Sequence, residues 1–331
     1  MKKKFISAIL SVMMVGSLLL TGCGGENSNE TAGAGSTSAA AENKETFTIG
    51  FSDFSLTAEY QAKLRDEILD YAEKTYGDEL EFVVLDGESD SDTQNSGIDN
   101  LISQKVDLII MVPFDAEQQI PAVQAAVDAG IPLLEVCLQT ADDGLRTSFV
   151  GSDDTSSGVL EMQCLAEAMG GKGNVVYLHG PTGQDSEIKR HEGANQVLED
   201  YPDIEVAAES VCNWDRAEAM TAIENYVQSG MQIDAIFCEN DEMALGAYAA
   251  IEGTDLEGKI HIGGIDCISD ALQAVKDGKL DCTVLQDAKL QASEVVEAAY
   301  KVLHGEDVEE YIEVPYQLVT KDNADDEYFN N

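Results

Sequence analysis

Basic residues are scarce in this chain of 331 amino acids, because 19 Lys and Arg stand against 63 Asp and Glu and give a formal net charge of −44. Such a field repels phosphate backbones, which argues against nucleic acid as a partner. Apolar residues make up 44% of the chain and charged residues 25%, as in average soluble proteins. This composition argues against wholesale disorder and against a multi-span membrane protein. The length allows about two domains with buried cores.

The motifs of common catalytic sites are missing as well. There is no G-x-S-x-G elbow and no G-x-x-x-x-G-K-[ST] loop, and His191-Glu192 lacks the second His of H-E-x-x-H. Residues 90–95 start like a calcium loop, but Asn95 and Leu101 stand at its sixth and twelfth positions, so we interpret the stretch as an acidic turn. We therefore predict a protein that is not an enzyme and that needs no metal or cofactor.

The cysteines show no C-x-x-C pair, and so the usual zinc and redox spacings are absent. Six of them could form disulfides in fifteen pairings, and the sequence does not choose among these pairings or exclude all of them. Most of the six lie in apolar runs, which favours small buried thiols. They are Cys137, Cys164, Cys212, Cys238, Cys267 and Cys282.

The N-terminus predicts export from the cytoplasm. Three lysines precede an apolar run at residues 5–20 that is too short for a comfortable membrane span, as in a signal peptide ending at residue 22. Leu20-Thr21-Gly22-Cys23 resembles a lipobox, the bacterial lipoprotein signal whose cysteine is diacylated and becomes the new N-terminus. Residues 23–45 then provide the lipidated Cys23 and a flexible polar tether. We expect an extracytoplasmic protein, anchored by lipid to the outer face of the cell membrane.

From Phe47 onward, short apolar runs alternate with amphipathic stretches, which predicts βαβ units and parallel sheets. The predicted strands are 47–51, 82–86, 107–112, 131–136, 174–180, 234–239, 260–266 and 282–286. The predicted helices are 58–75, 117–129, 155–169, 187–200, 215–229, 241–252 and 288–304. So many strands favour two doubly wound sheets over one.

Ligands of open α/β sheets bind beyond the carboxyl ends of the strands. The pattern alone therefore points to the residues that follow the apolar runs. They are Asp53, Asp86, Phe114, Asp115, Cys137, Gln139, His179, Glu239, Asn240, Asp266 and Gln286.

Five segments resemble the ribose/galactose-type (type 1) sugar-binding proteins of bacterial ABC importers, in that family's order and spacing. They are G-x-x-GQDSEIKRHEG (180–193), NWDRAEAM (213–220), ENDEMALGA (239–247), GIDCISDALQAVKDGKLDCTVLQD (264–287) and YIEVPYQLVT (311–320). The resemblance covers essentially all of residues 46–320. It implies an α/β fold of two Rossmann-like, doubly wound parallel-sheet lobes that close on a ligand about a three-crossover hinge.

In that fold each lobe is discontinuous in sequence. The resemblance implies a first lobe of residues 46–151 plus 288–313, a second lobe of 152–287 plus 314–325, and a tail of 326–331. The crossovers would lie near 150–153, 286–288 and 313–315.

The resemblance also implies second-lobe and hinge residues that contact the sugar. Carried over residue by residue, these are Arg190, Trp214, Asn240, Asp266 and Gln286. The carboxylate and amides can hold hydroxyl groups, the guanidinium offers a fork of donors, and the indole offers a flat face to C–H groups. Asn240 could also cap the helix that follows it.

The first lobe departs from the family pattern. Cys137-Leu138 replaces an Asp-Arg pair, and Glu59-Tyr60 replaces paired phenylalanines. Half of the pyranose clamp is therefore missing. We consider five substitute contacts: Asp53, Tyr60, Asp115, Glu135 and Gln139. This change, together with motifs like those of the inositol and polyol branch, favours a neutral polyhydroxylated ligand over ribose, glucose or galactose.

The sequence therefore predicts a lipid-anchored substrate-binding protein that captures a sugar, inositol or other polyol for ABC permease subunits. One alternative is a receptor that signals to a sensor kinase or chemoreceptor, and another is a binder of a non-sugar small molecule. Lac-type repressors share the two-lobe body, but they need a basic helix-turn-helix where this chain has its signal and tether. A repressor is therefore excluded.

Overall fold

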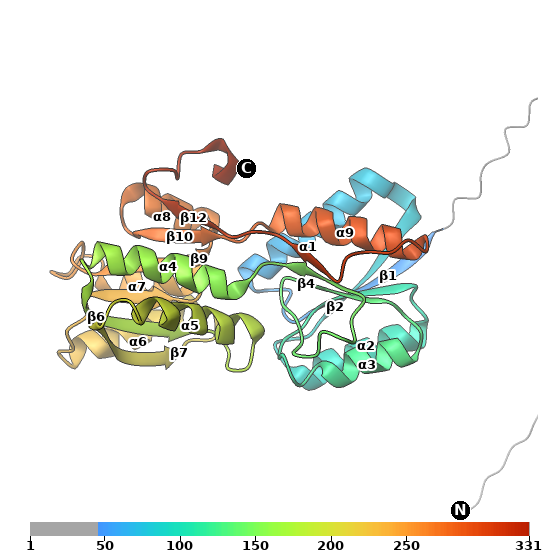
Figure 1. Cartoon of the computed structure of the whole chain (residues 1–331), viewed down its shortest axis with the longest axis horizontal. Coiled ribbons are helices and arrows are strands. Elements are labelled where there is room, and N and C mark those ends of the chain that lie inside the picture. Colours follow the sequence, from blue (N-terminus) through green and yellow to red (C-terminus); the bar gives the residue numbers. More distant parts are fainter. Residues whose placement is uncertain (1–45, 331) are drawn as a thin grey trace, which may run out of the picture. The chain divides into compact units, whose positions relative to one another are not determined.

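Two six-stranded sheets form the core of the computed structural model, which describes residues 46–330. The predicted signal peptide, Cys23 and the tether lie outside these residues. Each sheet has helices on both faces, and all strand pairs are parallel except for β10 with β12. The predicted α/β fold with two parallel-sheet lobes is confirmed, apart from this one antiparallel edge (Figure 1).

The first lobe has the strand order β11-β5-β4-β3-β1-β2. Its strands are β1 (Phe47–Asp53), β2 (Leu80–Asp86), β3 (Leu108–Val112), β4 (Leu133–Val136), β5 (Ser148–Gly151) and β11 (Tyr311–Glu313). Its helices are α1 (Glu59–Tyr76), the short 3-10 helix η1 (Gly77–Glu79), α2 (Ser91–Gln104), α3 (Ile120–Asp128) and α9 (Ala288–Leu303).

The second lobe has the strand order β12-β10-β9-β8-β6-β7. Its strands are β6 (Lys172–His179), β7 (Asp203–Val211), β8 (Ala235–Cys238), β9 (His261–Asp266), β10 (Cys282–Leu285) and β12 (Gln317–Thr320). Its helices are α4 (Asp154–Ala168), α5 (Asp185–Leu198), α6 (Arg216–Gln228), α7 (Asp241–Ile251) and α8 (Ser269–Asp277), and the 3-10 helix η2 (Glu327–Asn330) follows β12.

The central strands are continuous apolar runs because both of their faces are covered. In β3, Leu108, Ile110 and Val112 pack under α1 and α9, whereas Ile109 and Met111 pack under α2 and α3. Figure 1 shows these two helix pairs on opposite faces of the sheet. The period-2 alternation of strand side chains therefore feeds two separate cores.

The chain passes between the two sheets three times. It leaves the first sheet after β5 and enters α4, returns after β10 to α9, and crosses again between β11 and β12. The carboxyl ends of the strands in both lobes face these crossings and the loops that flank them, which places the loop residues of the two lobes together.

The interpretation of residues 90–95 as an acidic turn was wrong. Asp90 is the N-cap of α2, and its Oδ1 accepts a hydrogen bond of 2.8 Å from the Thr93 amide. The Asp-Ser-Asp sequence is a helix start, in which a side-chain oxygen satisfies an otherwise unpaired amide of the first turn. The rest of helix α2 was not predicted either, and the same holds for β5, β7, β11, β12 and α8.

The six cysteines of the described residues are free thiols, five of them buried and Cys164 partly exposed. This agrees with the interpretation of buried thiols in apolar runs. No helix within residues 46–330 combines the length and the apolar character that a membrane crossing requires.

Two glycines bring α4 and α5 into close contact. A Cβ atom on Gly193 of α5 would overlap the Thr155 carbonyl of α4, and one on Gly158 of α4 would overlap the Arg190 carbonyl of α5. The absence of side chains here sets the distance between the two helices, and through it the position of Arg190.

We expect Gly193→Ala to lower the free energy of unfolding by about 1–3 kcal/mol, because the added methyl meets backbone that can move only with its helix. Gly97→Ala in α2 is the matched control, since its Cβ would meet Leu85 at an ordinary 3.5 Å. That substitution should be neutral or stabilising by about 0.5–1 kcal/mol. Urea unfolding measures both variants, and equal midpoints for Gly193→Ala and wild type would contradict the packing account.

Candidate functional site

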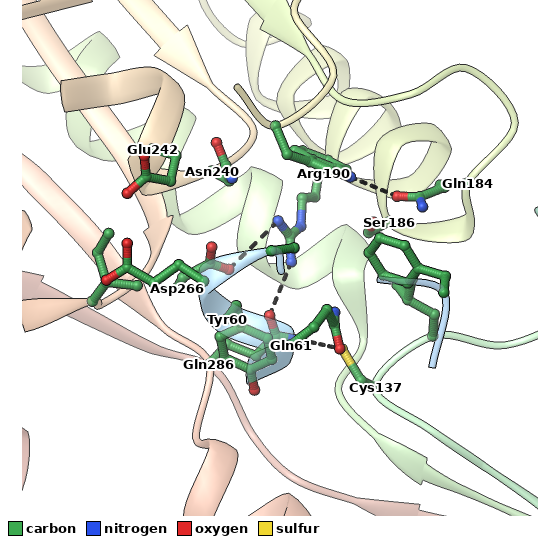
Figure 2. Close-up of a pocket in the computed structure, with 16 residues that line it drawn as sticks. Tyr60, Gln61, Cys137, Gln184, Ser186, Arg190, Asn240, Glu242, Asp266 and Gln286 are labelled. Carbon is green, nitrogen blue, oxygen red and sulfur yellow. Dashed lines mark hydrogen bonds and ion pairs between the residues drawn. The ribbon is translucent and has the colours of Figure 1, made fainter. Parts of the chain in front are cut away.

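A small cavity lies between the loops of the two lobes (Figure 2). Its volume is ≈ 70 Å³. One water needs roughly 10–15 Å³ on this measure, so the cavity holds a small molecule and not a polymer. The lining residues are Phe54, Ala58, Glu59, Tyr60, Gln61, Cys137, Leu138, Gln184, Ser186, Arg190, Trp214, Asn240, Glu242, Asp266, Ile268 and Gln286.

The guanidinium of Arg190 on α5 forms one wall, and it is buried (3% exposed). Its Nε donates to Asp154 Oδ1 at 3.1 Å, and its Nη2 donates to Tyr316 Oη at 3.1 Å and to Gln286 Oε1 at 3.3 Å. Its Nη1 donates to the Glu239 carbonyl. The Tyr316 hydroxyl in turn donates to Asp154 Oδ1 at 2.6 Å. Asp154, Gln286 and Tyr316 lie at the three chain crossings, so one side chain joins all of them.

Asp266 supplies a buried carboxyl group at the end of β9. Arg190 Nη1 lies 3.9 Å from its Oδ1. Burial raises the pKa of Asp266 well above its ordinary value, and the nearby guanidinium opposes this only in part. Hydroxyl groups of a bound molecule that donate to this carboxylate would stabilise its charged form. The residue has φ +125°, a conformation that residues other than glycine seldom adopt and that is typical of ligand sites.

The other second-lobe contacts sit at helix starts. Asn240 caps α7, and its Oδ1 accepts from the Met243 amide at 2.9 Å, which leaves its amide group at the cavity. Trp214 precedes α6 in a left-handed conformation, φ +62°. Its Nε1 donates to Gln184 Oε1 at 2.7 Å, and its ring lies so close to Gly180 that a Cβ there would overlap it. The indole face is therefore fixed in place.

The first-lobe wall is built around Cys137, where the family pattern has a charged pair. The Cys137 thiol is buried and accepts weak hydrogen bonds from Gln286 Nε2 at 3.4 Å and Gln61 Nε2 at 3.8 Å. Tyr60 donates its hydroxyl to Gln291 Oε1 at 3.2 Å. This wall is polar but uncharged, and Figure 2 shows Tyr60, Gln61 and Cys137 opposite Arg190.

Carboxylates from both lobes border the mouth of the cavity. Arg216 holds Glu242 through two hydrogen bonds of 2.9 and 2.7 Å. Glu59 of the first lobe lies beside Glu242, and burial followed by this contact raises the pKa of Glu59 to about 7. A backbone hydrogen bond of 3.0 Å from Ala116 to Gly183 also joins the two lobes. The structure therefore shows the lobes in contact over the cavity.

Six of the ten sequence-predicted contact residues line this cavity. They are Tyr60, Arg190, Trp214, Asn240, Asp266 and Gln286.

The other four do not line it, and each has a partner within the protein. Asp115 accepts from two backbone amides at the start of its own loop, at 2.9 and 2.8 Å. Glu135 is paired with Arg146 at 3.3 Å, and Gln139 accepts from the same arginine at 2.9 Å. Asp53 is fully buried and accepts a 3.2 Å hydrogen bond from a backbone amide.

Several lining residues were not singled out from the sequence. Gln184 and Ser186 belong to the GQDSEIKR motif, from which only Arg190 was predicted to contact the ligand. Glu242 likewise lies in the ENDEMALGA motif, whereas Gln61 neighbours Tyr60 on α1 and belongs to none of the five motifs.

Comparison with known proteins agrees with this fold. The family model for the periplasmic binding protein domain matches residues 49–307. The xylitol-binding protein of Mycolicibacterium smegmatis is 38% identical over 97% of this chain and 86% of its own length. The ribose import binding protein of Bacillus subtilis is 31% identical over 96% of this chain and 99% of its own.

Solved structures show the same likeness. A solute-binding protein of Bacillus halodurans with bound myo-inositol has a TM-score of 0.82 and 36% identity, and the match covers 87% of this chain and 99% of that one. A second, from Actinobacillus succinogenes with bound D-allose, has a TM-score of 0.78 and 32% identity over 84% of this chain and 99% of that one.

The chain therefore belongs to the periplasmic binding protein family, and its fold is the type 1 fold of that family. The predicted resemblance to ribose-type import proteins is confirmed. The family is extracytoplasmic, in agreement with the predicted compartment.

The buried Asp53 should make the free energy of unfolding depend on pH. Its Oδ2 is buried without a hydrogen-bond partner among the described residues, and burial raises its pKa from 3.8 to about 8. The folded state therefore holds a proton that the unfolded state releases near pH 4. The stability that this proton contributes is complete below about pH 4 and is lost progressively as the pH rises from there through about 8.

We expect the free energy of unfolding of wild type to fall by about 2.7 kcal/mol more than that of Asp53→Asn between pH 6 and pH 9. Urea unfolding at several pH values measures this difference, with the exposed Asp200→Asn as control. Parallel pH profiles for wild type and Asp53→Asn would show that Asp53 is already ionised at pH 6.

Proposed function

We propose that the protein captures one small neutral polyol, such as an inositol, a sugar alcohol or a sugar, between its lobes and presents it to an ABC permease. The observation that carries the proposal is the buried Asp266 carboxyl group in the cavity between the lobes, with Arg190 at 3.9 Å. Arg190 already pairs with the buried Asp154 at 3.1 Å, and burial raises the pKa of Asp266 well above its ordinary value, so a neutral ligand brings no uncompensated charge into the cavity. Hydroxyl groups can donate to the carboxylate and accept from the guanidinium and from amides.

The remaining walls fit such a ligand. The amide group of Asn240 can donate to a ligand hydroxyl, because its oxygen already caps α7, and Gln286 adds a second carboxamide to the cavity wall. Trp214 offers an apolar face to the C–H side of a ring or chain. Cys137 and Leu138 stand where the resemblance implies the charged pair of a pyranose clamp, which supports polyols over ribose. The relatives that bind xylitol and myo-inositol point to the same ligand class.

Capture is a conformational process and needs no chemical step. In the open state, solvent reaches the walls of both lobes, and the ligand binds mainly to the second lobe. The first-lobe wall then closes over it by rotation about the three crossings. The closed surface, with both lobes in register, is what a permease would recognise.

A thermal-shift panel of inositols, sugar alcohols, pentoses, hexoses, nucleosides and amino acids tests the ligand class. A cleft ligand at 100 times its Kd stabilises the protein by about 2.7 kcal/mol, which gives a clear rise in Tm. We expect at least one polyol or sugar to produce it. A shift with an amino acid or a nucleoside, and none with any polyol or sugar, would contradict the proposal.

Asp266→Asn tests whether the Asp266 carboxyl group binds the ligand. Loss of charge-assisted hydrogen bonds should raise the Kd for the polyol found in the panel by roughly 10–150-fold, because each is worth about 1.5–3 kcal/mol. Calorimetric titration measures the Kd, and Asp200→Asn on the exposed surface should leave it unchanged. An unchanged Kd for Asp266→Asn would place the ligand elsewhere.

We also propose that the protein is anchored through a diacylated Cys23. The lipobox-like Leu20-Thr21-Gly22-Cys23 and the polar segment after it support this assignment. Cells fed a clickable fatty acid should label the wild type and Cys164→Ser, whereas Cys23→Ser should remain unlabelled. Label on Cys23→Ser, or none on the wild type, would contradict the anchor.

A further inference from the structure

A second cluster of polar side chains lies next to the ligand cavity in the second lobe, but it does not line that cavity. His179 is the last residue of β6, Glu239 follows β8 directly, and His191 lies on α5. One ring nitrogen from each histidine and one carboxylate oxygen lie within 4.8 Å of one another. The proposed function assigns no role to these three side chains.

The contacts of His179 fix the direction of its two ring nitrogens. Nδ1 lies 2.9 Å from Glu239 Oε1, and Nε2 lies 3.0 Å from Glu209 Oε2 on β7. Glu239 is fully buried, and its other oxygen accepts a 2.8 Å hydrogen bond from the Gly180 amide. The imidazole is thus held between an inner carboxylate, on Glu239, and an outer one, on Glu209, whose side chain is about half exposed.

His191 brings a nitrogen that lacks a partner. Its Nδ1 is buried and forms no hydrogen bond within the described part of the chain. Its ring lies edge-on to Tyr177, with centroids 5.5 Å apart, and its centroid is 5.0 Å from that of His179. A buried polar atom without a protein partner costs free energy, and a bound ligand at this nitrogen would remove that cost.

We propose that His179, His191 and Glu239 form a binding site for one divalent transition-metal ion, with Zn²⁺ as the best match. Two imidazoles and one carboxylate are a ligand set that zinc uses, with a water in the fourth position. Oxygen-preferring Ca²⁺ and Mg²⁺ fit it poorly. In a tetrahedral site, zinc ligands about 2.0–2.1 Å from the metal lie roughly 3.4 Å from one another, so only small side-chain movements are needed.

Glu209 completes the arrangement as an outer partner. When Nδ1 of His179 binds the metal, Nε2 carries the proton and donates a hydrogen bond to Glu209 Oε2. Carboxylates commonly accept such a hydrogen bond from metal-bound histidines. The negative carboxylate of Glu239 then faces a cation directly instead of a histidine proton.

The site adjoins the ligand cavity through the backbone. The Glu239 carbonyl accepts from Arg190, and Asn240 follows it in sequence. A metal at Glu239 would therefore stabilise the segment that positions both cavity residues. The test below uses metal alone and no polyol, so its failure leaves the proposed function untouched.

Protein stripped with EDTA and dialysed is titrated with ZnCl₂ by calorimetry, and its Tm is followed in parallel. We expect one zinc per chain and a higher Tm, with no such effect from CaCl₂ or MgCl₂. His191→Gln should raise the zinc Kd by at least about ten-fold, and Glu209→Gln should raise it by about 10–100-fold. His261→Gln is the matched control, since His261 lies half-exposed at the start of β9 and contacts Asp281.

The absence of one-to-one zinc binding would overturn the proposal. It would also be overturned if His191→Gln and Glu209→Gln both bound zinc as wild type does, or if His261→Gln lost the binding instead. Circular dichroism confirms that each variant is folded. Because the two test substitutions lie on different elements, a folding defect in one leaves the other as a test.

Discussion

Arg190 places one buried guanidinium among Asp154, Gln286 and Tyr316, and these three residues stand at the three points where the chain passes between the lobes. An arginine suits this position because its planar fork donates in several directions and stays charged when buried. Removing it would leave Asp154 as a buried charge without its cation. The cavity, the hinge and the second lobe are therefore tied to the position of this side chain.

That position depends in turn on helix packing. Gly158 and Gly193 let α4 and α5 touch through their backbones, so the α5 turn that carries Arg190 is pressed against the start of α4 that carries Asp154. Nη1 of the same guanidinium lies 3.9 Å from Asp266 Oδ1, and both residues line the cavity. A ligand that contacts Asp266 and Gln286 therefore touches partners of Arg190, which couples occupation of the cavity to the geometry of the crossings.

The sequence predicted the parts of the fold that depend on strong local patterns. Runs such as 107–112 are apolar at successive positions, which is typical of a strand whose sheet has helices on both faces. Short edge strands such as β11 and β12 were not predicted, because their half-exposed residues carry no such pattern and are fixed by pairing with distant segments. Helix α2 was not predicted, because Asp90 and Ser91 at its start occur in turns as well as in helix caps.

The candidate site shows the same division. The motif residues of the second lobe, among them Arg190 and Asp266, line one cavity as the resemblance implied. In the first lobe, the strand-end rule brought Asp115 and Gln139 to the correct edge, but it does not tell which side chains face the cavity and which bind partners within the protein. That choice depends on partners such as Arg146, which lie outside any motif.

A crystal structure of the protein with its best polyol tests the central claim most directly. The account predicts the ligand in the cavity between the lobes, with hydroxyl groups within hydrogen-bond distance of Asp266, Asn240 and Arg190 and its C–H face against Trp214. The contacts from Arg190 to Asp154 and Tyr316 should be retained. A ligand bound outside this cavity, or one that contacts Asp53 or Glu135 in place of Asp266, would contradict it.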